Sequence, residues 1–195
     1  MKQYTLDTNV FRYKTNPTGD HALRNSAKSF WKGTLREIQS GEAVLLVPEE
    51  VVRELKVQSF TLAEKEKRKI ADLLGFCQEV SPNRLSIEIE HKIRELSAYV
   101  RSNFKSDIGQ DKMEYGGISD SRILYTAYDE DSILVTANVK DFLLYPLLFP
   151  HNEERLFDMK ENKFVRIPEQ GYYKIHSDIG FKSMLQSFFE FDNEQ

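Results

Sequence analysis

The chain has 195 residues, of which 40% are hydrophobic and 30% are charged, and its formal net charge at pH 7 is −4. This length suits one folded domain with a sizeable core, and the composition is that of an ordinary globular protein. The mild acidity excludes a general attraction to nucleic acid, so any such contact needs a local basic patch. A single cysteine, Cys77, excludes an internal disulfide framework and a cysteine-based metal site.

No apolar run approaches the length that spans a bilayer, and the first residues lack the pattern of a secretory signal. We therefore expect a cytoplasmic protein that does not contact a membrane. Cys77 is expected to be a buried small apolar residue.

Strand and helix patterns alternate along the chain. Strands are expected at residues 4–6, 43–47 and 132–136, since each is a short apolar run of the kind that parallel sheets bury on both faces. The segments between them show helical spacing of apolar residues or a polar composition with Gly and Pro. We expect helices at residues 21–40, from 49 onward, 61–79, 86–105 and 118–127, a break at 81–83, and loops at 12–20 and 106–117.

This order predicts an α/β protein with a central parallel sheet and right-handed crossovers. We expect a single domain over residues 1–195, with a core at about 1–150 and a C-terminal extension at about 151–195. The extension is expected to hold short strands near Leu156 and Val165 and an aromatic-rich last helix.

Asp7 directly follows the first expected strand and is itself followed by Thr8 and Asn9. A carboxylate at this end of a parallel strand faces the crevice where open α/β sheets bind ligands. The alternative interpretation is that Asp7 caps the helix that follows it.

Further polar side chains follow the other expected strands. Glu54 lies in the helix after the second strand, Asp120 lies in a helix expected to be capped by Ser119, and Asn138 and Asp141 follow the strand at 132–136. The carboxyl ends of parallel strands gather at one edge, so these residues can meet there. Neighbouring carboxylates repel one another unless a cation lies between them, and oxygen ligands suit Mg²⁺ or Mn²⁺ rather than Zn²⁺.

Four segments in this order resemble the motifs of PIN-domain ribonucleases, a family that includes toxins of toxin–antitoxin pairs. The resemblance implies a three-layer α/β/α fold with a central parallel sheet, here with a helical insertion between Glu54 and Asp120. It also implies a metal-dependent endoribonuclease that acts on RNA, with a cognate antitoxin and a homodimer as the candidate protein assemblies. The segments are residues 4–11, 51–55, 118–124 and 133–142.

The resemblance also implies roles for individual residues. The catalytic metal ligands for Mg²⁺ or Mn²⁺ would be Asp7, Glu54, Asp120 and Asp141, and the supporting polar residues would be Thr8, Asn9, Thr136 and Asn138. The family often has an aspartate where this chain has Asn138, so the fourth position is open between Asn138 and Asp141.

Several basic and aromatic residues are candidates for substrate contacts. Arg12 and Lys14, just past Asp7, are placed to meet RNA phosphates. The lysines and arginine at 65–69 alternate with glutamates, which favours a solvated helix face with internal salt bridges. The phenylalanines between 181 and 191 are more typical of a core or of a partner contact than of a base-stacking platform.

Two other functions remain as alternatives. A phosphatase of the haloacid-dehalogenase type needs a second aspartate two residues after the first, and this chain has Asn9 there. A catalytically inactive PIN-like interaction module would be expected to have lost acidic residues, whereas all four candidates are present.

Overall fold

The structure is a computed structural model that describes residues 1–82, 86–109 and 113–194. Asn83, at the end of the expected break, and residues 110–112, in the middle of the expected 106–117 loop, lie outside the described residues.

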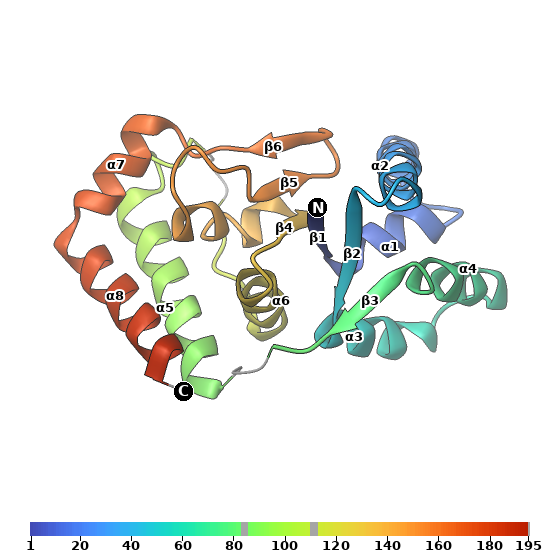
Figure 1. The fold of residues 1–195 in the computed structure, drawn as a ribbon, viewed down its shortest axis with the longest axis horizontal. Coiled ribbons are helices and arrows are strands. Elements are labelled where there is room, and N and C mark those ends of the chain that lie inside the picture. The colour runs from blue at the N-terminus through green and yellow to red at the C-terminus, as the bar shows by residue number, and fades with distance from the viewer. Residues whose placement is uncertain (83–85, 110–112, 195) are drawn as a thin grey trace.

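Six strands form one sheet in the order β3-β2-β1-β4-β5-β6 (Figure 1). All neighbouring pairs are parallel except β5 and β6, which are antiparallel. In the register, Tyr4 pairs with Leu45 on one side and with Ile133 on the other. The three strands expected from the sequence are therefore neighbours in a parallel sheet. The strands are β1 (Lys2–Leu6), β2 (Ala43–Pro48), β3 (Cys77–Val80), β4 (Ile133–Thr136), β5 (Leu156–Asp158) and β6 (Lys163–Val165).

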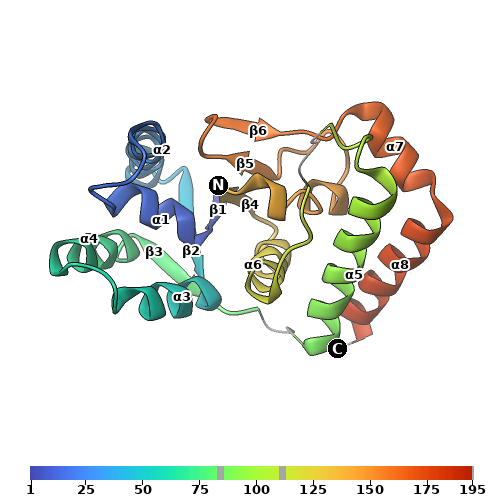
Figure 2. The ribbon, with the colours of Figure 1, turned by 180° about the vertical axis from the view of Figure 1, so that it is seen from behind.

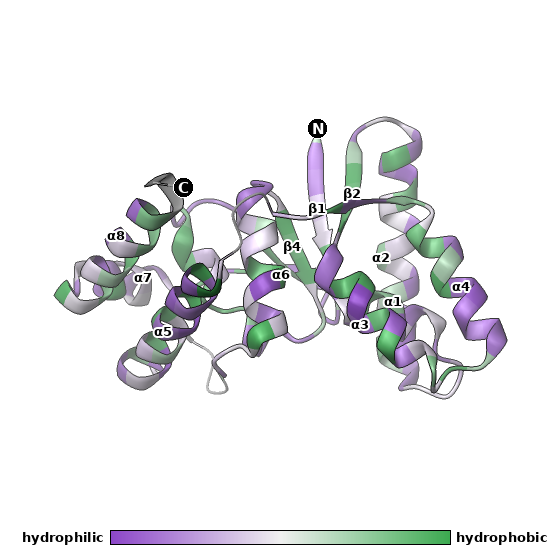
Figure 3. Cartoon of the chain, turned by 90° about the horizontal axis from the view of Figure 1, so that it is seen from below, coloured by the Kyte–Doolittle hydropathy of each residue, from purple (hydrophilic) through white to green (hydrophobic). Residues whose placement is uncertain are grey.

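Helices cover the sheet on both sides, which confirms the expected α/β class. Figure 3 shows α1, α2 and α4 on one side of the strands and α5, α7 and α8 on the other. Within the described ranges, no helix combines the length and the apolar composition that a membrane span needs. The α-helices are α1 (Thr8–Thr15), α2 (His21–Gln39), α3 (Glu49–Ser59), α4 (Glu64–Leu74), α5 (Ile87–Phe104), α6 (Ile118–Asp129), α7 (Glu169–Ser177) and α8 (Ile179–Glu194).

The sheet has a switch point between β1 and β4. The chain leaves β1 toward β2 and β3, then returns through α5 and α6 to pair β4 with the opposite side of β1. Connections therefore diverge at the carboxyl ends of these two strands, where open α/β sheets form their ligand crevice.

Helix α1 is fixed by the core immediately after β1. Leu6, Val10, Phe11 and Trp31 are fully buried, and the rings of Phe11 and Trp31 pack edge to face with centroids 5.5 Å apart. The indole Nε1 of Trp31 donates to the carbonyl of Val10 at 3.1 Å, so α2 holds α1 in place through both packing and a hydrogen bond.

Three details of the expected elements are wrong. The helix expected over residues 61–79 ends at Leu74, and the chain then forms the edge strand β3, because Gly75 stops the helix. The loop expected at 12–20 begins four residues later, since α1 continues to Thr15. Cys77 is only partly exposed rather than fully buried, and its Sγ donates to the carbonyl of Leu73.

The C-terminal segment joins both the sheet and the helical layer. The short strands expected near Leu156 and Val165 are β5 and β6, and the aromatic-rich last helix is α8. Helices α7 and α8 run beside α5 (Figure 2). Phe181 and Phe188 are fully buried there, so of the two roles expected for these aromatic residues, core and partner contact, these two side chains take the core.

Candidate active site

Asp7 lies at the carboxyl end of β1 and is only 4% exposed. Its Oδ2 accepts hydrogen bonds from Thr136 Oγ1 at 2.7 Å and from Asn9 Nδ2 at 3.2 Å. Although its backbone occupies the N-cap position of α1, its side chain makes no capping hydrogen bond. The capping interpretation is therefore wrong, and the carboxylate is held at the switch point by the end of β4.

Glu54 reaches the same region from α3. Its Oε2 accepts a hydrogen bond from the hydroxyl of Thr8, the residue after Asp7. This contact joins the first turn of α1 to the middle of α3. Glu54 is therefore bonded to the residue that directly follows Asp7.

Asp120 lies in the first turn of α6 and caps that helix. Its Oδ2 accepts from the backbone N–H of Gly117 at 2.8 Å, so the N-cap residue is Gly117 and the expected cap at Ser119 is wrong. A Cβ on the preceding Gly116 would lie 3.0 Å from Asp120 Cβ and 3.3 Å from the Asp141 carbonyl oxygen. Gly116 therefore fits between the segments that carry Asp120 and Asp141 because it has no side chain.

The residues after β4 form a short chain of hydrogen bonds. The Asn138 backbone N–H donates to Thr136 Oγ1 at 2.8 Å, and Asn138 Nδ2 donates to Asp141 Oδ2. Because the Thr136 hydroxyl accepts from Asn138, its proton is directed toward Asp7. Asn138 thus bonds directly to Asp141, and through Thr136 it fixes the hydrogen bond to Asp7.

The carboxylates influence one another electrostatically. Burial raises the pKa of Asp7 to about 6, and the nearby charges of Asp120 and Glu54 add to this increase. Burial also raises the pKa of Asp141 to about 6, again with a contribution from Asp120. Asp120 therefore acts on both aspartates, and we call Asp7, Glu54, Asp120 and Asp141 together the acidic site.

The chemistry of these side chains suits a hard divalent cation. All four candidate ligands are carboxylates and they repel one another, which favours Mg²⁺ or Mn²⁺ over Zn²⁺. In the described part of the chain, however, no three His, Cys, Asp or Glu side chains are arranged so that they could hold one ion. Each carboxylate instead accepts a hydrogen bond from another protein group. The carboxylates are therefore suitable ligands for a cation by type, but their present arrangement does not enclose one.

The two basic residues predicted for substrate contacts lie in the last turn of α1, away from Asp7. Arg12 is partly buried, and its Nη1 has no hydrogen-bond partner within the described residues. Lys14 lines a cavity between α1, α2 and α4. The structure therefore places Lys14 at the opposite end of α1 from the acidic site.

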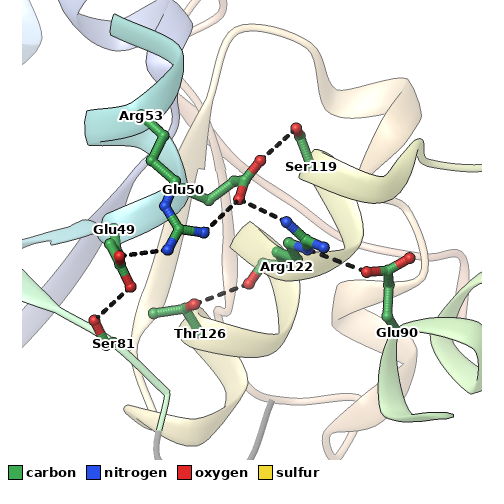
Figure 4. Close-up of polar contacts among 8 residues, drawn as sticks. All are labelled: Glu49, Glu50, Arg53, Ser81, Glu90, Ser119, Arg122 and Thr126. Carbon is green, nitrogen blue, oxygen red and sulfur yellow. Dashed lines mark hydrogen bonds and ion pairs between the residues drawn. The ribbon is translucent and has the colours of Figure 1, made fainter. Parts of the chain in front are cut away.

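A network of charged residues beside the acidic site was missed from the sequence (Figure 4). Arg122 on α6 pairs through Nη1 with Glu50 on α3 at 3.2 Å and through Nε with Glu90 on α5 at 3.1 Å. Ser119 donates to Glu50 Oε1 at 2.7 Å. Glu50 precedes Glu54 by one helical turn, so the network fixes α3 against the helix that carries Asp120. Contacts between such distant segments leave no local sequence signal.

No protein-family model and no curated protein sequence matches this chain. Similar solved structures include VapBC2 from Rickettsia felis bound to a promoter DNA fragment, with 21% identity, a TM-score of 0.48, and coverage of 72% of this chain and 90% of that chain. They also include FitAcB from Neisseria gonorrhoeae, with 18% identity, a TM-score of 0.39, and coverage of 72% of this chain and 91% of that chain. At this level of similarity neither structure bears on activity or partners, which have to be argued from the residues of this chain.

Proposed function

We propose that this protein is a metal-dependent endoribonuclease whose acidic site hydrolyses phosphodiester bonds in RNA. The observation that carries the proposal is the placement of the buried Asp7 at the carboxyl end of β1, bonded to Thr136 of β4, with Glu54 bonded to the adjacent Thr8. The four carboxylates of the acidic site come from separate segments and lie at the switch point of a parallel sheet. The resemblance of the surrounding motifs to PIN-domain ribonucleases supports the same function.

The residues that would hold Mg²⁺ or Mn²⁺ are Asp7, Glu54 and Asp120, with Asp141 as the fourth acid. When bound, such an ion lowers the pKa of water and neutralises charge on the phosphate.

The protein side chains orient the carboxylates, and a carboxylate accepts the proton of the attacking water. Thr136 and Thr8 hold Asp7 and Glu54 in fixed orientations. Burial raises the pKa of Asp141 to about 6, which is near the neutral pH that suits a general base. In the proposed reaction a water oxygen bonds to phosphorus, the water proton passes to a carboxylate, and the bond from phosphorus to O3′ breaks. The products are a 5′-phosphate and a 3′-hydroxyl, whose proton comes from solvent.

The direct test compares the wild type with Asp120→Asn on a mixed pool of single-stranded RNA, each with Mn²⁺ and with EDTA. Asparagine keeps an oxygen that can accept the N–H of Gly117, so the helix cap is retained while the charge is lost. We expect cleavage only by the wild type and only with Mn²⁺. Equal cleavage by Asp120→Asn would contradict the assignment of the site.

A second candidate function is a catalytically inactive interaction module with this fold. The observation that favours it is the hydrogen bonding of every carboxylate in the acidic site to a protein donor, without an arrangement that encloses an ion. It predicts that the wild type cleaves none of the RNAs in the pool and that divalent cations do not change its melting temperature.

The proposal extends to a toxin whose activity a cognate antitoxin blocks, since the family that the motifs resemble includes such toxins. Expression of the chain should then arrest growth, and co-expression of a protein from a neighbouring reading frame should relieve the arrest. Growth arrest that persists in Asp120→Asn would contradict an RNA-cleaving toxin.

A further inference from the structure

Helices α1, α2 and α4 line a solvent-open cavity of about 430 Å³ with an excess of positive charge. Figure 2 shows α1 between the other two helices, and α1 contacts both of them. Four basic side chains line the cavity, and Asp72 is the acidic residue of the lining. The basic residues are Lys14 from α1, Arg24 and Lys28 from α2, and Lys69 from α4.

The four positive charges of this basic cavity exceed the single negative charge of Asp72. In the described part of the chain, none of its four cations forms an ion pair, whereas Lys67 on the same helix as Lys69 pairs with Glu64 at 2.6 Å. Arg24 donates through Nη1 to the carbonyl of Pro17 at 2.8 Å, and its Nε is buried with no hydrogen-bond partner among the described residues. A buried guanidinium donor without an acceptor costs free energy unless a ligand supplies one.

The cations are also close enough to repel one another. The pKa of Lys14 is lowered by its burial and by the charges of Lys28 and Lys69. The dipole of α1 favours a cation at its last turn and so accounts for Lys14 alone. The dipole does not account for the lysines that α2 and α4 bring to the same cavity. A bound anion would reduce the repulsion among these lysines.

We propose that the basic cavity binds a backbone phosphate of single-stranded RNA and so holds the substrate strand whose scissile phosphate lies at the acidic site. This inference rests on the proposed nuclease function for the identity of the ligand. Arginine and lysine are the side chains that bind phosphate through charge-assisted hydrogen bonds. Helix α1 has eight residues and a length of about 12 Å, so one short strand can contact both of its ends.

The test measures binding of a short, fluorescently labelled single-stranded RNA by anisotropy in EDTA, where cleavage is not expected. Lys69→Ala is compared with Lys65→Ala on α4, and Lys28→Ala with Lys32→Ala on α2. All four lysines are exposed, and Lys65 and Lys32 lie outside the cavity, so each pair carries the same charge change on the same helix. We expect each cavity variant to weaken binding about 3- to 10-fold and to reduce the slope of log affinity against log salt by roughly 0.7.

The controls should bind as the wild type does. Equal weakening by all four variants would mean a general attraction to the surface and would overturn the proposal, as would unchanged binding in both cavity variants. A glutamate-rich peptide that competes as well as RNA does would overturn it in favour of an acidic polypeptide. If the cavity variants lose RNA binding but the wild type does not cleave with Mn²⁺, the phosphate site stands and the nuclease function is wrong.

Discussion

Helix α1 has the acidic site at its first turn and the basic cavity at its last turn, and the two regions are built differently. Asp7 is almost fully buried and is hydrogen-bonded to side chains from α1 and β4. At the other end, Lys28 and Lys69 are exposed and none of the basic residues has an ionic partner within the described residues. The dipole of α1 favours Asp7 at its first turn and Lys14 at its last turn. Each of the four acids is hydrogen-bonded to another residue, whereas within the described residues Lys14, Lys28 and Lys69 show no ion pair.

This difference matches two tasks of the proposed nuclease. Catalysis requires groups that are already oriented before the transition state, because reorientation during the reaction adds to the barrier. Holding a flexible strand requires accessible charge that adapts to different sequences. We therefore assign chemistry to the acidic end and attachment of the strand to the basic end.

The largest expected effect separates the two ends by steady-state kinetics with Mn²⁺. Asp7→Asn should lower kcat by at least about 10²-fold, because it removes a charged ligand of the ion that would activate water and neutralise the phosphate. Lys69→Ala should raise KM several-fold and leave kcat unchanged, because it removes binding that is equal in the ground and transition states. If Lys69→Ala lowered kcat as much as Asp7→Asn does, the basic cavity would not be a binding region separate from the catalytic acidic site.

The second prediction uses the raised pKa of Asp7. Its pKa is about 6 in the folded protein and 3.8 in the reference state, so this group stabilises the fold fully below pH 4 and the contribution is lost as the pH rises through 6. Above pH 6 the buried charge costs about 3 kcal/mol. Asp7→Asn should therefore be more stable than the wild type at pH 7, by up to about 3 kcal/mol.

Urea denaturation in EDTA between pH 4 and pH 7 measures this effect. The advantage of Asp7→Asn should shrink as the pH falls toward 4. A difference between the two proteins that stays constant with pH would show that Asp7 titrates normally.

The third prediction concerns the rigid framework of the acidic end. Arg122→Met should cost about 2 kcal/mol, because it leaves Glu50 and Glu90, which are 13% and 9% exposed, without their shared partner. The matched control is Arg53→Met, since the Arg53 side chain is 60% exposed. This substitution should lower the free energy of unfolding by less than about 1 kcal/mol. Chemical denaturation measures both, and equal losses would contradict a framework role for Arg122.

The smallest expected effect is that of Lys67→Ala on α4. Its ion pair with Glu64 is exposed and contributes less than about 0.5 kcal/mol. RNA affinity should also stay unchanged, since Lys67 does not line the basic cavity. A marked loss of RNA affinity would extend the binding surface along α4 beyond the cavity.

The sheet could be predicted from the sequence because its central strands are short apolar runs followed at once by polar residues. Asp7 was placed at a strand end by this pattern alone. Strand β3 could not be predicted, since Gln78 and Glu79 between Cys77 and Val80 lack an apolar run. Gly75 was the available signal that the preceding helix ends.

The positions of the candidate acids could be predicted, but their partners could not. The bond between Thr136 and Asp7 joins residues 129 apart in the chain, and the pair of Arg122 and Glu50 joins residues 72 apart. Such contacts depend on how the helices pack across the sheet. The basic cavity was missed for the same reason, because its cations come from three helices and only Lys14 follows Asp7 closely.

The most direct test of the central claim is calorimetric titration of Mn²⁺ into the wild type, Asp7→Asn and Lys69→Ala. We expect the wild type and Lys69→Ala to bind Mn²⁺ alike and to melt at a higher temperature with it, because an ion that binds only the folded state stabilises it. Asp7→Asn should lose most of both effects. Absence of binding by the wild type, or equal binding by Asp7→Asn, would contradict a metal-dependent acidic site.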